Sequence, residues 1–293
     1  MKILLTGGTG QVGREVIRRA AGRAFELIAP PREQLDLSRR SSVDDALQQH
    51  RPDLVISSGA YTAVDRAEDE PALAQTINGE APGWIGSACA AAGVPVLHLS
   101  TDYVFAGDKP APYVESDATG PLGVYGASKL AGELALLGSG ANAVILRVSW
   151  VFAGHGGNFV KTMLRLGADR DELRVVADQR GGPTYAGHIA EALLELAARY
   201  AAQRELRWGI YHYAGAPQTN WHEFAQAILE RAFAKGMIKR LPAVQAIATR
   251  DYPTRAPRPG NSAMDCQRAE SLLGLARPDW RAGLEETLDE LSA

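Results

Sequence analysis

The chain has 293 residues, of which 46% are hydrophobic and 22% charged, and its formal net charge is −3. This composition excludes a disordered chain, and the small net charge with scattered Lys and Arg residues excludes nucleic acid as the expected partner. The length predicts two closely packed lobes, because it exceeds the usual size of one hydrophobic core and no linker divides the sequence.

The cysteines and the start of the chain bear on the cellular compartment. Cys89 and Cys266 have no metal-ligand spacing, which predicts free thiols in a reducing environment. The N-terminus passes from Met1 and Lys2 into a short apolar run that lacks the pattern of a signal peptide. No uncharged run approaches the roughly 20 residues of a membrane span. We therefore expect a soluble, cytoplasmic protein without a membrane partner.

The first half of the chain alternates short apolar runs with segments of helical spacing. Strands are predicted at 3–5, 25–29, 53–57, 94–100 and 144–148, and helices at 11–21, 43–49, 72–92 and from about 125. Strands that are apolar on both sides belong to a parallel sheet covered by helices on both faces. The sequence therefore predicts an α/β fold with a doubly wound Rossmann sheet, and residues 1–150 form its dinucleotide-binding domain.

After Trp150 the alternation is looser. Helices are predicted at 158–168, 187–200, 221–233 and 281–291, and strands at 173–176 and 209–213. We expect residues 151–293 to form mainly a smaller, interleaved α/β substrate lobe, with some elements returning to the Rossmann sheet. The proline-rich segment 252–262 cannot be a regular helix or a central strand, so it is either an ordered loop over the substrate or an ordinary surface connection.

A glycine motif joins the first strand to the first helix. Gly7, Gly10 and Gly13 have no β-carbons, which permits a tight turn and lets the backbone approach a pyrophosphate at the helix N-terminus. The strand-turn-helix context predicts dinucleotide binding more strongly than the glycines alone do. The GxxGxxG spacing is typical of short-chain dehydrogenases/reductases.

The residues after the second strand bear on the choice of cofactor. Arg32 stands where an acidic residue would bind the adenosine 2′-hydroxyl, so it can meet a 2′-phosphate and NADPH should be usable; it is otherwise a solvated surface arginine. Asp36 and Leu37 are placed to contact the adenine, although Asp36 can also belong to a helix cap. Small residues at 58–62 end the third strand and suit close passage of the cofactor.

The predicted chemical site combines a phenol, an ammonium and a hydroxyl. Tyr125 and Lys129 are an i, i+4 pair on one helix, so the lysine cation would lower the pKa of the phenol and make it a better proton donor. Thr101, at the end of the fourth strand, can hydrogen-bond the same carbonyl oxygen. Asp102 either binds a substrate hydroxyl or caps the following turn. These groups predict reduction of a carbonyl or oxidation of an alcohol.

Several segments together carry a family resemblance that runs almost end to end. The segments are GGTGQVG at 7–13, STDYVF at 100–105, VYGASK at 124–129, RVSWVF at 147–152 and RPGNS at 258–262. They resemble the dTDP-4-dehydrorhamnose reductase family of extended short-chain dehydrogenases/reductases. The resemblance implies that NADPH, or NADH, reduces the C4 ketone of dTDP-4-dehydro-L-rhamnose to dTDP-L-rhamnose, a precursor of cell-surface polysaccharides.

The resemblance also implies roles for individual residues. Tyr125 is the proton donor, Lys129 its modulator and Thr101 the carbonyl partner. The positions that match the cofactor-binding positions of the family are Gly10, Gln11, Val12, Asp36, Leu37, Ala60, Tyr61 and Thr62. Those that match its sugar-binding positions are Thr101, Asp102 and Trp150. Trp150 is predicted to stack on the deoxyhexose, while a core position is the alternative for such an aromatic.

Three arginines are candidates for binding the diphosphate of the substrate. The guanidinium fork of Arg258 suits phosphate oxygens, and Arg255 and Arg180 are alternatives. Some members of the family dimerise through a magnesium-binding carboxylate cluster, so a monomer and a homodimer both remain open. The acidic residues that could form such a cluster, or be simply solvated, are Glu285, Glu286, Asp289 and Glu290. No metal site is predicted from them.

Two other functions use the same parts. A reductase or epimerase of another nucleotide sugar has the same Rossmann and Tyr/Lys groups, but an epimerase keeps its cofactor through turnover and a reductase consumes reductant. A non-catalytic nucleotide-binding regulatory subunit would keep the fold and have damaged catalytic positions. The presence of Thr101, Tyr125 and Lys129 argues against that alternative.

Overall fold

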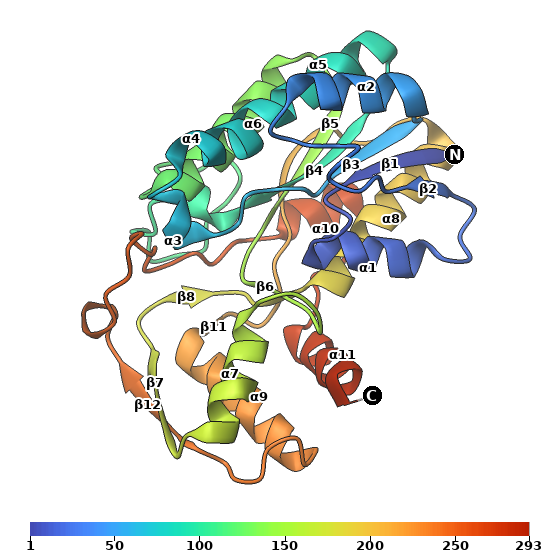
Figure 1. Cartoon of the computed structure of the whole chain (residues 1–293). Helices are drawn as coiled ribbons and strands as arrows, with labels where there is room; N and C mark the ends of the chain where they lie inside the picture. Colours follow the sequence, from blue (N-terminus) through green and yellow to red (C-terminus); the bar gives the residue numbers. More distant parts are fainter. Residues whose placement is uncertain (293) are drawn as a thin grey trace.

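A parallel sheet of six strands forms the centre of the computed structural model, which describes residues 1–292 (Figure 1). The strand order is β10-β5-β4-β3-β1-β2, and every neighbouring pair is parallel. The strands are β1 (Lys2–Thr6), β2 (Glu26–Ile28), β3 (Leu54–Ser57), β4 (Val96–Thr101), β5 (Ala143–Val148) and β10 (Gly209–His212). The predicted doubly wound α/β sheet is confirmed.

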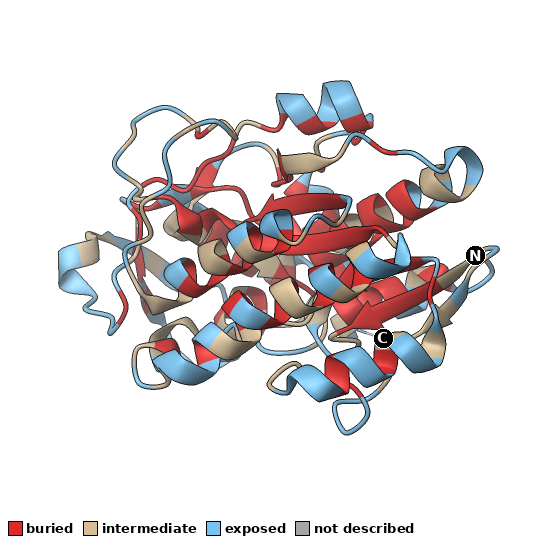
Figure 2. Cartoon of the chain, turned by 90° about the horizontal axis from the view of Figure 1, so that it is seen from above, coloured by how far each residue is buried: buried red, intermediate tan, exposed pale blue. Residues whose placement is uncertain are grey.

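Helices cover both faces of the sheet because successive side chains of each strand point to opposite faces. On β1, Ile3 and Leu5 belong to the core beneath one helical layer and Leu4 belongs to the core beneath the other. Figure 2 shows the buried central strands between the helices, whose outer sides are exposed. The first layer contains α1 (Gln11–Ala20), α8 (Ala186–Gln203) and α10 (Gln267–Leu273). The second contains α2 (Arg40–His50), α5 (Ala81–Ala92) and α6 (Val124–Gly138).

The start of α6 determines where Tyr125 lies. A 3-10 turn, Asp102–Val104, follows β4 and packs against α6. At Gly126 an added β-carbon would lie 2.2 Å from the carbonyl oxygen of Tyr103, so only glycine allows this close approach. The first turn of α6 is thereby held against the end of β4, which brings Tyr125 and Thr101 to the same edge of the sheet.

Short elements link β3 to α5. They are α3 (Val64–Ala67), α4 (Pro71–Ala74) and a π-helical turn, Gln75–Glu80. The predicted helix over 72–92 is thus divided into a short helix, a π-helical turn and α5. Within α5, Cys89 is buried, and so is Cys266 farther along the chain; both are free, as predicted.

The second lobe has its own hydrophobic core, in which aromatic rings of β6, α7 and α9 pack together. Its strands are β6 (Val151–Phe152), β7 (Glu172–Val176), β8 (Arg180–Gly181), β9 (Thr184–Tyr185), β11 (Thr219–Asn220) and β12 (Ala243–Ile247). Its helices are α7 (Phe159–Asp169), α9 (Trp221–Ala234), the 3-10 turn Thr249–Asp251 and α11 (Trp280–Ser292). Side chains of Asn158 and Asn220 cap α7 and α9 by accepting from backbone N–H groups.

The chain enters the second lobe and returns to the Rossmann sheet more than once. Between visits to the second lobe, α8 packs on α1 and β10 pairs with β5. α10 then packs against β10 before α11 ends in the second lobe. The division at residue 150 stays a prediction. The chain passes between the two parts several times, so no single linker joins them.

The proline-rich segment 252–262 forms no helix or strand. It crosses from the second lobe to the Rossmann part, where Ala256 N donates to Asp65 Oδ1 (3.1 Å) and Asn261 N donates to Gly107 O (3.0 Å). It is therefore an ordered connection, although whether it covers substrate stays a prediction. No helix within residues 1–292 has the length and apolar character needed to span a bilayer.

Candidate active site

A cavity of about 650 Å³ opens at the carboxyl ends of the central strands. Ligands of doubly wound sheets bind at this edge. The predicted site residues that line it are Gly7, Gly10, Gln11, Val12, Gly13, Arg32, Asp36, Leu37, Ala60, Thr62, Thr101, Asp102, Tyr125, Lys129 and Trp150. Of the predicted set, Tyr61 and Arg258 lie outside this lining. The cavity thus gathers segments far apart in the sequence.

The glycine loop forms one wall of the cavity. Gly7 has a φ of +72°, and its carbonyl oxygen accepts from Gly10 N at 2.9 Å, which closes the turn into α1. An added β-carbon at Gly13 would lie 2.1 Å from Gly7 O. Among residues 1–292, no side chain caps the N-terminus of α1, so its first backbone N–H groups are available for an anion at the cavity. This backbone fits a pyrophosphate.

The far end of the cavity carries Arg32 and Asp36. Asp36 Oδ1 accepts from both Ser38 N (2.9 Å) and Ser38 Oγ (2.7 Å), and these bonds hold the pKa of the carboxyl below its usual value. Asp36 stabilises the turn before α2, whose N-cap is Arg39. Arg32 is 72% exposed, with its Nε 3.9 Å from Asp36 Oδ1, so the guanidinium is free to reach a phosphate.

The segment after β3 presents its backbone and small side chains to the cavity. Ala60 and Thr62 line it, but Tyr61 turns away: its hydroxyl donates to Glu70 Oε2 at 2.5 Å. Tyr61 N donates to Asn78 Oδ1 (2.8 Å), which fixes the backbone of this segment. A cofactor contact of Tyr61 remains a prediction.

Tyr125, Lys129 and Thr101 lie together in the cavity wall. The desolvation of the phenol raises the pKa of Tyr125 to about 12, and the nearby Thr101 hydroxyl opposes this rise while Asp102 adds to it. The expectation that the pKa of Tyr125 is lowered is wrong for the free chain, because burial raises it. Tyr125 therefore stays protonated at neutral pH, which is the form that a proton donor needs.

Lys129 is 3% exposed, and its ammonium group contacts two residues of β4. Its Nζ donates to Leu99 O at 2.7 Å and lies 3.5 Å from His98 Nε2. Burial lowers the pKa of the ammonium to about 8, and the negative charge of Glu133 opposes this effect. The lysine head is thus charged at neutral pH and fixed in the floor of the cavity.

Asp102 offers an unpaired acceptor in the same wall. Thr101 Oγ1 donates to Asp102 Oδ1 (2.9 Å), and Oδ2 has no hydrogen-bond partner among residues 1–292. Burial raises the pKa of this carboxyl to about 6, and the nearby Ser262 partly opposes this rise. The Ser262 hydroxyl itself donates to Arg180 O. Thr101, not Asp102, caps the following 3-10 turn. A buried carboxylate oxygen without a donor is an acceptor for a substrate hydroxyl.

Trp150 combines the two alternatives considered for it. One face stacks on Trp221, with ring centroids 3.7 Å apart and planes 10° apart, and the residue also lines the cavity. Its φ of +48° is unusual for a bulky residue. An added β-carbon at Gly181 would lie 2.5 Å from the indole, so glycine is required beside it. Trp221 was not predicted as part of the site, because nothing in its helical pattern relates it to residue 150.

None of the three candidate arginines for the diphosphate lies in the described lining of the cavity. Arg258 Nη2 pairs with Asp65 Oδ2 at 2.7 Å, and Arg255 pairs with Asp69. Arg180 is exposed on β8. The assignment of Arg258 to the diphosphate therefore stays a prediction that requires it to exchange Asp65 for a phosphate.

A loop of the second lobe also reaches the glycine loop. Gly156 and Gly157 line the cavity, His155 Nε2 lies 2.9 Å from Gln11 O, and Asn158 Nδ2 donates to Gln11 Oε1 at 2.9 Å. These positions were not among the residues predicted from the sequence. Their glycines and the N-cap of α7 give the local signal, but only the fold brings them to Gln11.

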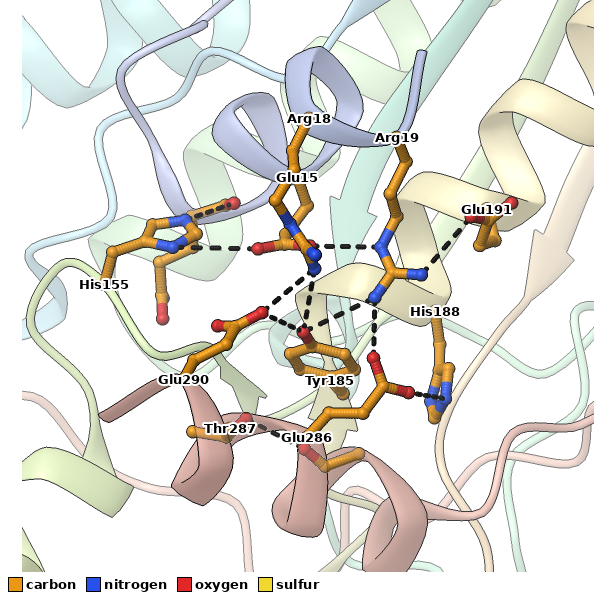
Figure 3. Close-up of polar contacts among 12 residues, drawn as sticks. Glu15, Arg18, Arg19, His155, Tyr185, His188, Glu191, Glu286, Thr287 and Glu290 are labelled. Atoms are coloured by element: carbon orange, nitrogen blue, oxygen red, sulfur yellow. Dashed lines mark hydrogen bonds and ion pairs between the residues drawn. The ribbon is translucent and has the colours of Figure 1, made fainter. Parts of the chain in front are cut away.

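Behind this loop, a set of ion pairs that we call the lobe clasp joins α1 and α8 to β9 and α11 (Figure 3). The lobe clasp consists of Glu15, Arg18, Arg19, Tyr185, Glu191, Glu286 and Glu290. Arg19 Nη2 lies 2.8 Å from Glu286 Oε2, and Arg18 Nη2 lies 3.0 Å from Glu290 Oε1.

The carboxylates considered for magnesium are already paired with cations. In addition to Glu286 and Glu290, Glu285 pairs with Arg231 at 2.8 Å, and Asp289 pairs with Lys235 at 2.5 Å. Glu15, His155 and Glu290 place one ligand atom each within 4.8 Å of one another, but Arg18 and Arg19 hold Glu15 Oε2. The arrangement supplies no observation in favour of magnesium.

Comparisons with known proteins agree with this geometry. A family model described as the RmlD substrate binding domain matches residues 1–293. The chain is 40% identical over 285 residues to a curated dTDP-4-dehydrorhamnose reductase of Aggregatibacter actinomycetemcomitans, covering 97% of each protein. It is similar to the crystal structure of a dTDP-4-dehydrorhamnose reductase from Clostridium acetobutylicum, with 32% identity, a TM-score of 0.92 and full coverage of both chains. A Bacillus anthracis reductase in complex with NADP is similarly close, with 33% identity, a TM-score of 0.90 and 99% coverage of both chains.

Proposed function

The chain belongs to the dTDP-4-dehydrorhamnose reductase family, and from this membership and its cavity we propose which residues bind and reduce the substrate. It is an NAD(P)H-dependent oxidoreductase that reduces the C4 ketone of dTDP-4-dehydro-L-rhamnose to dTDP-L-rhamnose. The observation that carries the residue roles is the convergence of Thr101, Tyr125 and Lys129 with the glycine loop in one cavity.

The glycine loop and the N-terminus of α1 hold the cofactor pyrophosphate, since Gly7 and Gly13 leave room for it and unpaired N–H groups face it. When bound, the reduced nicotinamide supplies the hydride for C4. Lys129 then donates to the nicotinamide ribose with an N–H that Leu99 O does not use. Its ammonium charge also favours the anion that forms when the phenol gives up its proton.

Tyr125 protonates the C4 oxygen as the carbon receives the hydride, so the ketone gains a hydride and a proton and becomes an alcohol. The Thr101 hydroxyl, which donates to Asp102 in the free chain, turns to donate a hydrogen bond to the same oxygen. Tyr125 begins the step protonated because burial raises its pKa. Lys129 would pass a proton from solvent back to Tyr125, with the ribose hydroxyl of a bound cofactor completing the path.

Asp102 and Trp150 orient the sugar. Asp102 Oδ2 accepts from a sugar hydroxyl, which supplies the donor that this buried atom lacks. The free face of Trp150 packs on the deoxyhexose while Trp221 supports the other face. Arg258 binds the diphosphate after it leaves Asp65.

We also propose that NADPH is the preferred reductant and that the enzyme works in the cytoplasm. Arg32 is exposed in the cavity lining and suits a 2′-phosphate, whereas the Asp36 carboxylate beside it is engaged by Ser38. Replacement of Arg32 by Ala should raise KM for NADPH and leave KM for NADH unchanged. Equal changes for both cofactors would contradict this role of Arg32.

The decisive experiment for the function follows NADPH oxidation with dTDP-4-dehydro-L-rhamnose and identifies the product by mass spectrometry. We expect one NADP formed per sugar reduced, and a Tyr125→Phe variant that binds NADPH but loses at least about 100-fold in kcat. Tyr200→Phe, at a tyrosine packed against Trp208 on the opposite side of the sheet, serves as the control. Undiminished turnover by Tyr125→Phe would overturn the assignment.

A further inference from the structure

The sheet face beneath α6 carries a row of polar residues within an apolar layer. Ser57 on β3 and His98 on β4 are register partners, and so are Ser100 on β4 and Arg147 on β5. Their strand neighbours Val55, Val96 and Ile145 belong to the apolar core on that face. These four polar residues are all buried, and Ser57, Ser100 and Arg147 are the last or next-to-last residues of strands whose carboxyl ends lead to the cavity.

His98 is the member of this row that touches the catalytic machinery. Its Nε2 lies 3.5 Å from Lys129 Nζ, and its Nδ1 lies 3.0 Å from Ser57 Oγ. The side chain is 1% exposed, so water does not compete for either nitrogen. A histidine that only filled the core would not require an ammonium group at its second nitrogen.

The charges around His98 fix its protonation state. Burial and the Lys129 cation hold the pKa of His98 well below its usual value, so the imidazole is neutral. Because an ammonium only donates, Nε2 must be the lone-pair nitrogen and the ring proton must be on Nδ1, from which it donates to Ser57 Oγ. The other charged groups packed here, Glu133 on α6 and Arg147 on β5, pair with each other.

We propose that His98 is a positioning residue for Lys129, which it aims at the cofactor ribose by accepting one ammonium N–H while Leu99 O accepts another. Ser57 fixes the imidazole tautomer that makes this possible. With two N–H groups directed at the protein, the third points toward the cavity that Lys129 lines. This proposal rests on the proposed function of Lys129.

The proposal predicts a specific effect on the charge of Lys129. A neutral acceptor favours the ammonium form, so its removal should lower the pKa of Lys129. The alkaline limb of the kcat profile should then move to lower pH by about one unit, a size typical of a lost polar contact in a buried site. A residue with a purely structural role would change stability and leave this limb in place.

Two amide variants separate the nitrogen that faces Lys129 from the one that faces Ser57. In His98→Gln the longer amide places an acceptor near the position of Nε2, whereas in His98→Asn the amide reaches only the position of Nδ1. We expect the limb to stay near its wild-type pH in His98→Gln and to move in His98→Asn and His98→Leu. His50→Asn, at the end of α2 and outside the cavity, is the matched control.

The test compares kcat, KM for NADPH and the pH profile of each variant, with folding checked by circular dichroism. An unmoved limb in both His98→Asn and His98→Leu overturns the positioning role. Ser57→Ala keeps the test decisive if His98→Leu does not fold, because loss of the tautomer anchor should move the limb in the same direction. An inactive wild-type enzyme would overturn the proposed function itself. If the wild type is active and Tyr125→Phe is inactive, the proposed function holds, and the His98 variants then test the positioning role alone.

Discussion

Arg147 and Glu133 form a two-pronged ion pair inside the core, with Arg147 Nε 2.9 Å from Glu133 Oε1 and Nη2 2.6 Å from Oε2. Ser100 Oγ also donates to Glu133 Oε1, and neither charged side chain is more than 3% exposed. Glu133 lies one helical turn after Lys129, where its charge favours the ammonium form. The negative charge of Glu133, balanced by Arg147, therefore lies close to the catalytic lysine.

Removal of Arg147 should be strongly destabilising. Arg147→Met leaves the Glu133 carboxylate buried without its cation, which should cost about 3–5 kcal/mol in the free energy of unfolding measured with urea. The double variant Arg147→Met/Glu133→Leu removes both charges and should regain most of that loss. A single variant that loses less than about 1 kcal/mol would contradict this account of the pair.

Catalysis should decline at alkaline pH. The pKa of Lys129 is lowered from 10.5 to about 8, so the ammonium predominates below pH 8 and is lost as the pH rises above it. We expect kcat to fall as the pH rises through 8, where half of the ammonium is lost. A Lys129→Arg variant keeps its charge throughout this range, so any remaining activity should lack the limb near pH 8. The same limb in Lys129→Arg would assign it to another group.

Trp150 should affect the sugar more than the cofactor. Trp150→Ala removes the ring that faces the cavity, and we expect KM for the keto sugar to rise about tenfold, equivalent to about 1.4 kcal/mol, with KM for NADPH unchanged. Trp150→Phe should recover part of the loss. Trp84→Ala, on α5 away from the cavity, controls for the loss of a tryptophan. Equal changes in both KM values would instead indicate a general disturbance of the cavity.

The lobe clasp should contribute stability through Arg19. Its guanidinium contacts Glu15, Glu191, Glu286 and the Tyr185 hydroxyl, with the side chain 17% exposed. Arg19→Ala should lower the free energy of unfolding by about 2 kcal/mol, since several charged hydrogen bonds are lost but some partners remain hydrated. Arg40→Ala, at an exposed arginine on α2, should have almost no effect.

Chelation of divalent ions should leave the protein unchanged. The carboxylates of α11 already lie next to arginine or lysine, so their repulsion is balanced without a metal. We expect the same Tm and the same oligomeric state with and without EDTA, measured by calorimetry and by light scattering. A lower Tm or a dissociating oligomer in EDTA would show that a divalent ion binds after all.

The central fold could be predicted from sequence because its signals are local and repeated. Apolar runs such as 3–5 and 144–148 have few alternatives to buried parallel strands, and the helices over 158–168 and 221–233 were placed to within about one residue. The two-residue strands β6, β8, β9 and β11 carry no periodicity and exist only because the fold brings their partners to them.

The site was predictable where a motif has fixed spacing and unpredictable where partners are distant. Tyr125 and Lys129 are joined by one helical turn, so the sequence alone places them on one side. The Trp150–Trp221 stack and the Arg258–Asp65 pair join residues 71 and 193 positions apart, and no local pattern links them. The raised pKa of Tyr125 could not be predicted, because it comes from burial, which composition cannot reveal.

The return of α8 and β10 to the central sheet limits how the chain can be cut. Ile189, Leu193, Leu194 and Leu196 of α8 supply much of the apolar core on one side, and β10 completes the sheet beside β5. A shortened protein ending at residue 150 would expose that apolar face of the sheet and leave β5 as an unpaired edge strand. Both changes favour aggregation. Engineers who wish to exchange sugar specificity by grafting lobes must therefore splice at several crossing points at once.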